Sequence, residues 1–211
     1  MGPRQLLPRS LRFSIAFSPL LLLLVPFSGA RSPSNPPAAV SKAAAAACSA
    51  KVQKLQDFAA DPERGKKQTT RFSQAELNSY LAFELSSKYH PSLKSLEIQL
   101  QEAKLEGTAA IDFDQLGMAS KGIMGKLVAK LFSGVHNLRI RGQLHAEGGK
   151  AYLVLDEAHF DDTSLPNFLI EEVITAVGRK QKPPFDPLKP SQMPYAIDRV
   201  DVHTGHILVH Q

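Results

Sequence analysis

The sequence is nearly without cysteine: Cys48 is the only one among 211 residues. A single thiol cannot form a disulfide within the chain, so other interactions must hold the fold. Cys48 lies in an alanine-rich stretch, far from the apolar run near the N-terminus and without the leucine of a lipoprotein cleavage box. We therefore interpret it as an unreactive thiol on a helix.

Familiar catalytic motifs are also missing. The sequence has no Gly-x-Ser-x-Gly elbow, no His-Glu-x-x-His and no phosphate-binding loop. His203 and His206 could flank one turn as a metal-binding pair, but no third ligand at helical spacing and no cysteine accompanies them. We predict no metal site, no cofactor and no enzymatic activity. A hydrolase with dispersed residues His145, His159 and Asp161 is the least favoured alternative.

Acidic residues are absent before Asp57. Three arginines in that region precede an apolar run over residues 15–27, and Ser28-Gly29-Ala30 follows it. This order is typical of a secretory signal peptide, so we predict one over residues 1–30, cleaved after Ala30. The run of about 13 residues is shorter than the ~20 that a membrane-spanning helix needs, and two prolines interrupt it. We expect an exported protein, periplasmic or extracellular.

The mature chain also lacks a large net charge. Removing residues 1–30 removes three arginines and leaves 22 basic against 20 acidic residues. The protein therefore has no electrostatic footprint for nucleic acid, and we predict no nucleic-acid partner.

The rest of the chain divides into two parts. Residues 31–65 are predicted to be a linker followed by an alanine-rich helix, in which Cys48, Val52 and Leu55 share one face. Alanine offers little surface to bury, so we expect this helix to dock weakly. Residues 66–211 are predicted to be the folded domain.

Three hairpins are predicted from alternating apolar residues on either side of short turns. Gly148-Gly149 is the clearest turn, because a two-residue hairpin loop needs the positive φ that glycine supplies. A second turn falls near Glu102-Ala103, and a third at Thr204-Gly205. A change of phase near Asp156-Glu157 indicates a β-bulge. The expected facing pairs are Glu147 with Lys150, Ala146 with Ala151, Leu144 with Leu153, Val202 with Ile207 and Val200 with Val209.

Helical patterns lie between the hairpins. Ser73 and Glu76 form a capping box that begins a helix over residues 74–87, and another helix follows Pro166 over residues 166–177. Residues 117–134 form an amphipathic pattern whose Lys121, Lys126 and Lys130 could meet a membrane surface, or could lie in water while the apolar face packs on the sheet. Residues 182–194 hold five prolines and must be extended. We predict an α+β fold: a curved antiparallel β-sheet built from three hairpins, with three to four α-helices packed on its apolar face.

The pattern over residues 71–211 resembles small bacterial envelope proteins related to the tubular lipid-binding (TULIP) superfamily. The features that carry the resemblance are the export signal, the helix opening at residues 72–81, the hairpins with alternating apolar residues, the proline-rich run, and the terminal segment 197–209. The resemblance implies a curved antiparallel sheet wrapped around a long helix, an apolar groove for acyl chains, and no catalytic residues. The helices predicted here are shorter than the central helix of that superfamily.

We therefore predict a non-enzymatic, exported protein that binds or handles lipid in an apolar groove between sheet and helices. The alternative is a cystatin-like protein-interaction or inhibitory module in which the same residues form a closed core. Periodicity alone does not separate groove from core. The groove candidates are Ile98, Leu100, Ile111, Phe113, Leu131, Phe132, Leu144, Leu153, Leu155, Phe160, Leu169 and Val173.

Overall fold

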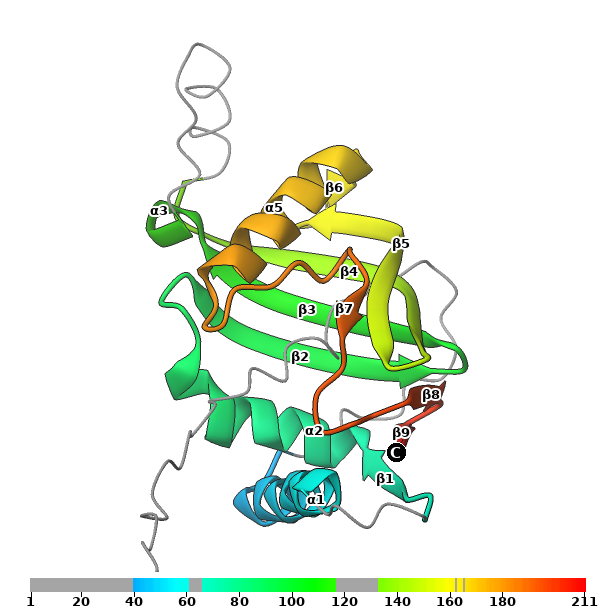
Figure 1. Ribbon diagram of the computed structural model, residues 1–211. Coiled ribbons are helices and arrows are strands. Elements are labelled where there is room, and N and C mark those ends of the chain that lie inside the picture. Colours follow the sequence, from blue (N-terminus) through cyan, green and yellow to red (C-terminus); the bar gives the residue numbers. More distant parts are fainter. Residues whose placement is uncertain (1–39, 61–65, 117–132, 162, 165) are drawn as a thin grey trace, which may run out of the picture.

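The computed structural model describes residues 40–60, 66–116, 133–161, 163–164 and 166–211 (Figure 1). The predicted signal peptide, the proline-rich start of the linker, the amphipathic segment with its three lysines, and the groove candidates Leu131 and Phe132 lie outside these residues. Among the described residues, no helix combines the length and apolar character needed to cross a membrane.

The fold is α+β, as predicted, with two antiparallel sheets. The larger sheet has the strand order β2-β3-β4-β5-β6, with β7 also paired to β5, and the smaller has the order β1-β9-β8. The strands are β1 (Thr69–Ser73), β2 (Leu93–Gln101), β3 (Lys104–Asp112), β4 (Val135–Glu147), β5 (Lys150–Phe160), β6 (Thr163–Ser164), β7 (Ser191–Gln192), β8 (Arg199–His203) and β9 (His206–His210). The helices are α1 (Lys42–Ala60), α2 (Gln74–Tyr80), α3 (Phe113–Leu116) and α5 (Asn167–Lys180), and α2 continues into a π-helical segment (Leu81–Leu85) and a 3₁₀ turn (Ser86–Lys88).

The structure contains the three predicted hairpins. The two whose facing pairs were predicted have those pairs, including Leu144–Leu153 and Val200–Val209. Gly148 and Gly149 take φ values of 61° and 77°, as their two-residue turn requires. The predicted bulge is confirmed as well. Arg141 faces Glu157 and Gly142 faces Leu155, which leaves Asp156 as the extra residue.

The third hairpin does not join the larger sheet, which differs from the single sheet that we predicted. It pairs through β9 with β1 instead. Backbone hydrogen bonds join it to the turn end of the larger sheet, where Ala103 donates to Val202 over 3.1 Å and Gly149 donates to Asp198 over 2.9 Å. The smaller sheet therefore extends the fold beyond the two long hairpins.

The apolar face of the larger sheet is covered by α5 and by the proline-rich segment that follows it (Figure 1). Ile170, Val173 and Ile174 of α5 are fully buried. The amide of Leu153 donates to the carbonyl of Pro187 over 2.9 Å, which fastens the proline-rich segment to β5. Of the other helices, α2 lies along β2 at the edge of the larger sheet, and α1 packs on α2.

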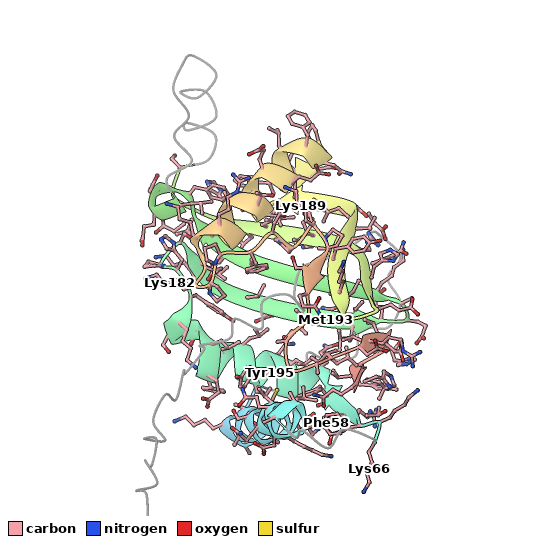
Figure 2. The ribbon with its side chains drawn as sticks, viewed as in Figure 1. Phe58, Lys66, Lys182, Lys189, Met193 and Tyr195 are labelled. Carbon is pink, nitrogen blue, oxygen red and sulfur yellow. The ribbon has the colours of Figure 1, made fainter. Side chains whose placement is uncertain are left out.

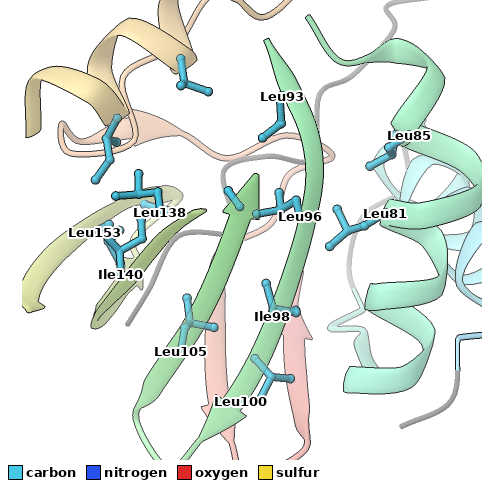
Figure 3. Packing of buried hydrophobic residues seen from close by; sticks show 14 of the residues in the cluster. Leu81, Leu85, Leu93, Leu96, Ile98, Leu100, Leu105, Leu138, Ile140 and Leu153 are labelled. Atoms are coloured by element: carbon cyan, nitrogen blue, oxygen red, sulfur yellow. The ribbon is translucent and has the colours of Figure 1, made fainter. Parts of the chain in front are cut away.

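Helix α2 protects the edge of the larger sheet. Its predicted capping box forms, with Ser73 Oγ accepting from the Glu76 amide over 3.3 Å and Glu76 Oε2 accepting from the Ser73 amide over 2.8 Å. One turn later, the Asn78 side chain donates to the carbonyl of Ile98 and accepts from its amide, both over 2.8 Å. An edge strand exposes unpaired amides and carbonyls. At Ile98, the Asn78 side chain supplies the two hydrogen bonds that a neighbouring strand would otherwise make. Figure 3 shows Leu81 and Leu85 directed from the same helix toward β2.

Replacing Asn78 by alanine removes both of these bonds and leaves the amide and carbonyl of Ile98 without their partner. We expect Asn78→Ala to lower the free energy of unfolding by about 2 kcal/mol, measured by urea denaturation. Asn137→Ala is the matched control, because that side chain is exposed on β4. A loss of stability no larger than that of the control would contradict the role of Asn78.

Candidate apolar ligand site

An apolar cavity of about 80 Å³ lies where the turn end of the β4–β5 hairpin meets α1, α2 and the smaller sheet. Five separate parts of the chain form its wall. Figure 2 labels Met193 and Tyr195 on the segment that runs from the larger sheet toward the helices. The lining residues are Cys48, Val52, Leu55, Phe72, Leu77, Tyr80, Leu81, Leu85, Leu144, Ala146, Ala151, Met193, Pro194, Tyr195, Ile197, Val200, Ile207 and Val209.

Helix α1 supplies one side of the cavity. Cys48, Val52 and Leu55 follow at intervals of four and three residues, so they share one helical face. Cys48 and Leu55 are buried, although the sequence predicted weak docking for this alanine-rich helix. Ser41 helps to position the helix, since its amide donates to the buried Ser79 Oγ over 3.1 Å.

Two irregular stretches of backbone meet at the cavity. The helix that contributes Leu77 and Tyr80 becomes π-helical at Leu81–Leu85, and both end residues of that segment line the cavity. On the other side, Tyr195 and Ala196 both adopt a φ of 53°, a left-handed conformation that residues other than glycine rarely take. Such irregularities cost conformational energy and are frequent at functional sites.

A glutamine side chain holds the irregular segment in place. Gln211 Nε2 donates to the carbonyl of Tyr195 and to the carbonyl of Leu55, the latter over 2.9 Å. Its Oε1 accepts from Gln68 Nε2 over 2.8 Å. Gln211 therefore joins α1, the segment before β8 and the residue before β1 in one network.

A charged pair fixes α1 against α2 beside the cavity. Lys51 Nζ lies 2.6 and 2.7 Å from the two carboxylate oxygens of Glu76 and donates to the carbonyl of Arg71 over 2.8 Å. Burial alone would raise the pKa of the Glu76 carboxyl, but the hydrogen bonds from Lys51 and Ser73 outweigh burial and hold that pKa below its usual value. Glu76 is thus both a helix cap and the partner of Lys51.

The few polar groups of the wall are a thiol and two hydroxyls. Burial, assisted by the Glu76 charge, raises the pKa of the Cys48 thiol to about 12, so the thiol is protonated and weakly reactive at neutral pH. Burial, followed by electrostatic interaction with Cys48, Tyr195 and Glu84, raises the pKa of Tyr80 to about 12. The cavity wall is therefore electrically neutral.

Of the groove candidates that the structure describes, only Leu144 lines this cavity. Leu155 and Phe160 are half-buried against the core, and Leu169 is half-buried on α5. The remaining described candidates are fully buried core residues: Ile98, Leu100, Ile111, Phe113, Leu153 and Val173.

Sequence reasoning missed most of the cavity wall. Several of its residues nevertheless belong to apolar faces that the sequence did predict. They are Cys48, Val52 and Leu55 on one helix, Ala146 and Ala151 in the Gly148-Gly149 hairpin, and Val200, Ile207 and Val209 in the third hairpin. No pattern in the sequence pointed to Tyr195, because its place in the wall depends on a backbone conformation and on a distant glutamine.

A second group of charges lies on the opposite face of the larger sheet. Glu106, Arg141 and Glu157 are neighbours across β3, β4 and β5, and Arg141 pairs with Glu157. His159 Nε2 lies 2.7 Å from Glu157 Oε1. Burial raises the pKa of Glu106 to about 7, although Arg141 and Arg139 oppose the shift.

The residues of the hydrolase alternative do not form one site. His159 belongs to the charged group, whereas His145 stacks on Tyr152 with ring centres 5.0 Å apart. Asp161 lies 2.8 Å from His136 Nδ1. Within the described ranges, no cluster of three or more histidine, cysteine, aspartate or glutamate residues could hold a metal ion.

The lowered pKa of Glu76 predicts a loss of stability in acid. Above the pKa of the unfolded state the ionised carboxylate stabilises the folded protein, and this contribution disappears as the pH falls through the lower folded pKa. We expect Glu76→Gln to lose about 1 kcal/mol at pH 7 and to show a flatter decline below pH 4.5. Urea denaturation from pH 3 to 7 tests this, with Glu84→Gln as an exposed control. Identical acid profiles of Glu76→Gln and the unmodified protein would refute the prediction.

The raised pKa of Glu106 predicts the opposite trend at higher pH. Its folded pKa exceeds the unfolded value, so the folded state keeps a proton that the unfolded state loses, and stability falls as the pH rises from about 4.5 through 7. We expect Glu106→Gln to remove a decline on the order of 2 kcal/mol between pH 5 and pH 8. Glu97→Gln, exposed on the same face of β2, should leave the decline in place.

Comparison with known proteins gives no relatives. No family model matches the chain, no curated protein matches it, and no solved structure matches it. The resemblance to the TULIP superfamily therefore stays a prediction from the sequence.

Proposed function

We propose that this protein is a non-enzymatic, exported lipid-binding protein that takes the end of an acyl chain into the cavity between α1, α2 and the β4–β5 hairpin. The observation that carries the proposal is the cavity itself, which is walled almost entirely by aliphatic and aromatic side chains. Concave, apolar sites with a few polar groups are the usual form of small-molecule sites. The predicted signal peptide supports the exported location.

The size of the cavity sets what can bind. An apolar protein cavity of about 150 Å³ stays dry and accepts benzene. At about 80 Å³, this cavity has room for a few methylene groups and not for a whole lipid. Each methylene moved from water into such a site contributes about 0.8 kcal/mol. A rigid cavity therefore favours short single chains with modest affinity, and a longer chain requires its wall to move.

The irregular backbone supports a role in binding. The π-helical segment Leu81–Leu85 and the left-handed pair Tyr195–Ala196 are both next to the cavity. They are expected where a wall must adapt to a ligand.

The alternative is a protein-interaction module in which the cavity is only imperfect packing. The burial of Ile98, Leu100 and Ile111 favours it, because the apolar face of the larger sheet is then an ordinary core. The two functions differ in one respect: a packing defect takes up no ligand, whereas a binding site does.

A larger side chain on the cavity wall distinguishes a binding site from a packing defect. We expect Ala146→Leu to reduce the affinity for hexane and hexanol at least tenfold, measured by chemical-shift perturbation, because its side chain would occupy the site. Val154→Leu, on the opposite face of β5 and 42% exposed, should bind like the unmodified protein. Native mass spectrometry of the purified protein should reveal bound lipid. If no compound with an alkyl chain binds the unmodified protein, the proposed function is wrong.

A further inference from the structure

The cavity wall includes a few neutral polar side chains. Tyr80 from α2 and Tyr195 from the segment before β8 both line the cavity and are half-buried. The Tyr195 hydroxyl accepts a hydrogen bond from Gln56 Nε2 over 2.9 Å. The Tyr80 side chain is close enough to Cys48 and Tyr195 to interact with them electrostatically. Neutral polar side chains from three elements thus form part of an otherwise apolar wall.

Among these groups the Tyr80 hydroxyl has unused hydrogen-bonding capacity. Within the described parts of the chain, the Tyr80 hydroxyl makes no hydrogen bond. By contrast, the hydroxyl of Tyr89, which follows the 3₁₀ turn, donates to the carbonyl of Leu81 over 3.4 Å. A phenol can donate one hydrogen bond and accept others. Tyr80 can therefore offer both to a polar atom of a ligand whose apolar part occupies the cavity.

The charges near the cavity disfavour an anionic ligand. Lys51, the cation that interacts electrostatically with Cys48, is held by both carboxylate oxygens of Glu76 and by the carbonyl of Arg71. Near Tyr80 the interacting charge is the acidic Glu84. An ionised carboxylate placed beside Tyr80 would lose hydration near the acidic Glu84, and Lys51 is already paired with Glu76.

We propose that Tyr80 selects amphiphiles whose polar end is an uncharged hydroxyl or carbonyl, and that it hydrogen-bonds that end while the alkyl part fills the cavity. This inference rests on the proposed function, since it assumes that an alkyl chain binds. The inference goes beyond the proposed function because it assigns the chemical class of the ligand's polar end and the residue that binds this end. Alcohols and esters with short chains are the expected ligands, and fatty-acid anions are excluded.

The test compares hexane, hexanol, methyl hexanoate and hexanoate at pH 7, by chemical-shift titration of the whole protein. Hexanol and methyl hexanoate should bind more tightly than hexane, and hexanoate at least tenfold more weakly than hexanol. Tyr80→Phe keeps the ring and removes the hydroxyl. It should weaken hexanol about fivefold, the equivalent of one hydrogen bond, and leave hexane unchanged. Tyr89→Phe is the matched control and should bind all four compounds normally.

Several results would overturn the inference and leave the proposed function intact. These are equal affinities for all four compounds, tightest binding of hexanoate, or a Tyr80→Phe variant that binds hexanol normally. If Tyr80→Phe loses affinity for hexane and hexanol alike, Tyr80 shapes the cavity and does not bind the polar end of the ligand. If none of the four compounds binds, the proposed function and the inference fail together.

Discussion

Burial of the turn end of the β4–β5 hairpin is the interaction on which the rest of the structure depends. Helix α5 and the proline-rich segment cover much of the apolar face of the larger sheet, but Leu144, Ala146 and Ala151 contact a different layer. That layer has to come from α1, α2 and the smaller sheet, which are far from the hairpin in sequence. Because five pieces of chain converge on a small apolar surface, their side chains meet without filling the space between them.

Polar contacts keep these pieces at fixed distances. Asn78 holds α2 on the edge of β2, Lys51 and Glu76 hold α1 on α2, and Gln211 holds Tyr195 against α1. Each contact joins groups that would otherwise be half-buried without a partner, so each resists a movement that would break it. Hydrogen bonds outside the cavity thus help to fix the position of its wall. This arrangement explains how an apolar space can persist in a close-packed protein.

The sequence predicted the structural features that depend on residues close together in the chain. The Gly148-Gly149 turn, the bulge at Asp156 and the Ser73–Glu76 capping box follow from local rules of backbone and side-chain chemistry. The sequence did not predict which sheet the third hairpin would join. Alternation in β8 and β9 shows which side chains share a face, but not which strand lies beside the hairpin. The cavity depends on contacts between distant segments and on the left-handed Tyr195, so periodicity assigned a groove to residues that form the core.

Leaving this space empty has an energetic cost that a ligand could offset. At about 24 cal/mol per Å³, a cavity of about 80 Å³ costs the folded protein about 2 kcal/mol. The left-handed backbone of Tyr195 and Ala196 adds about 1–3 kcal/mol each. A domain whose net stability is typically ~5–15 kcal/mol carries such costs only where other interactions impose them. Here the hydrogen bonds around the cavity impose them, and an alkyl group in the cavity would restore the lost contacts without disturbing those bonds.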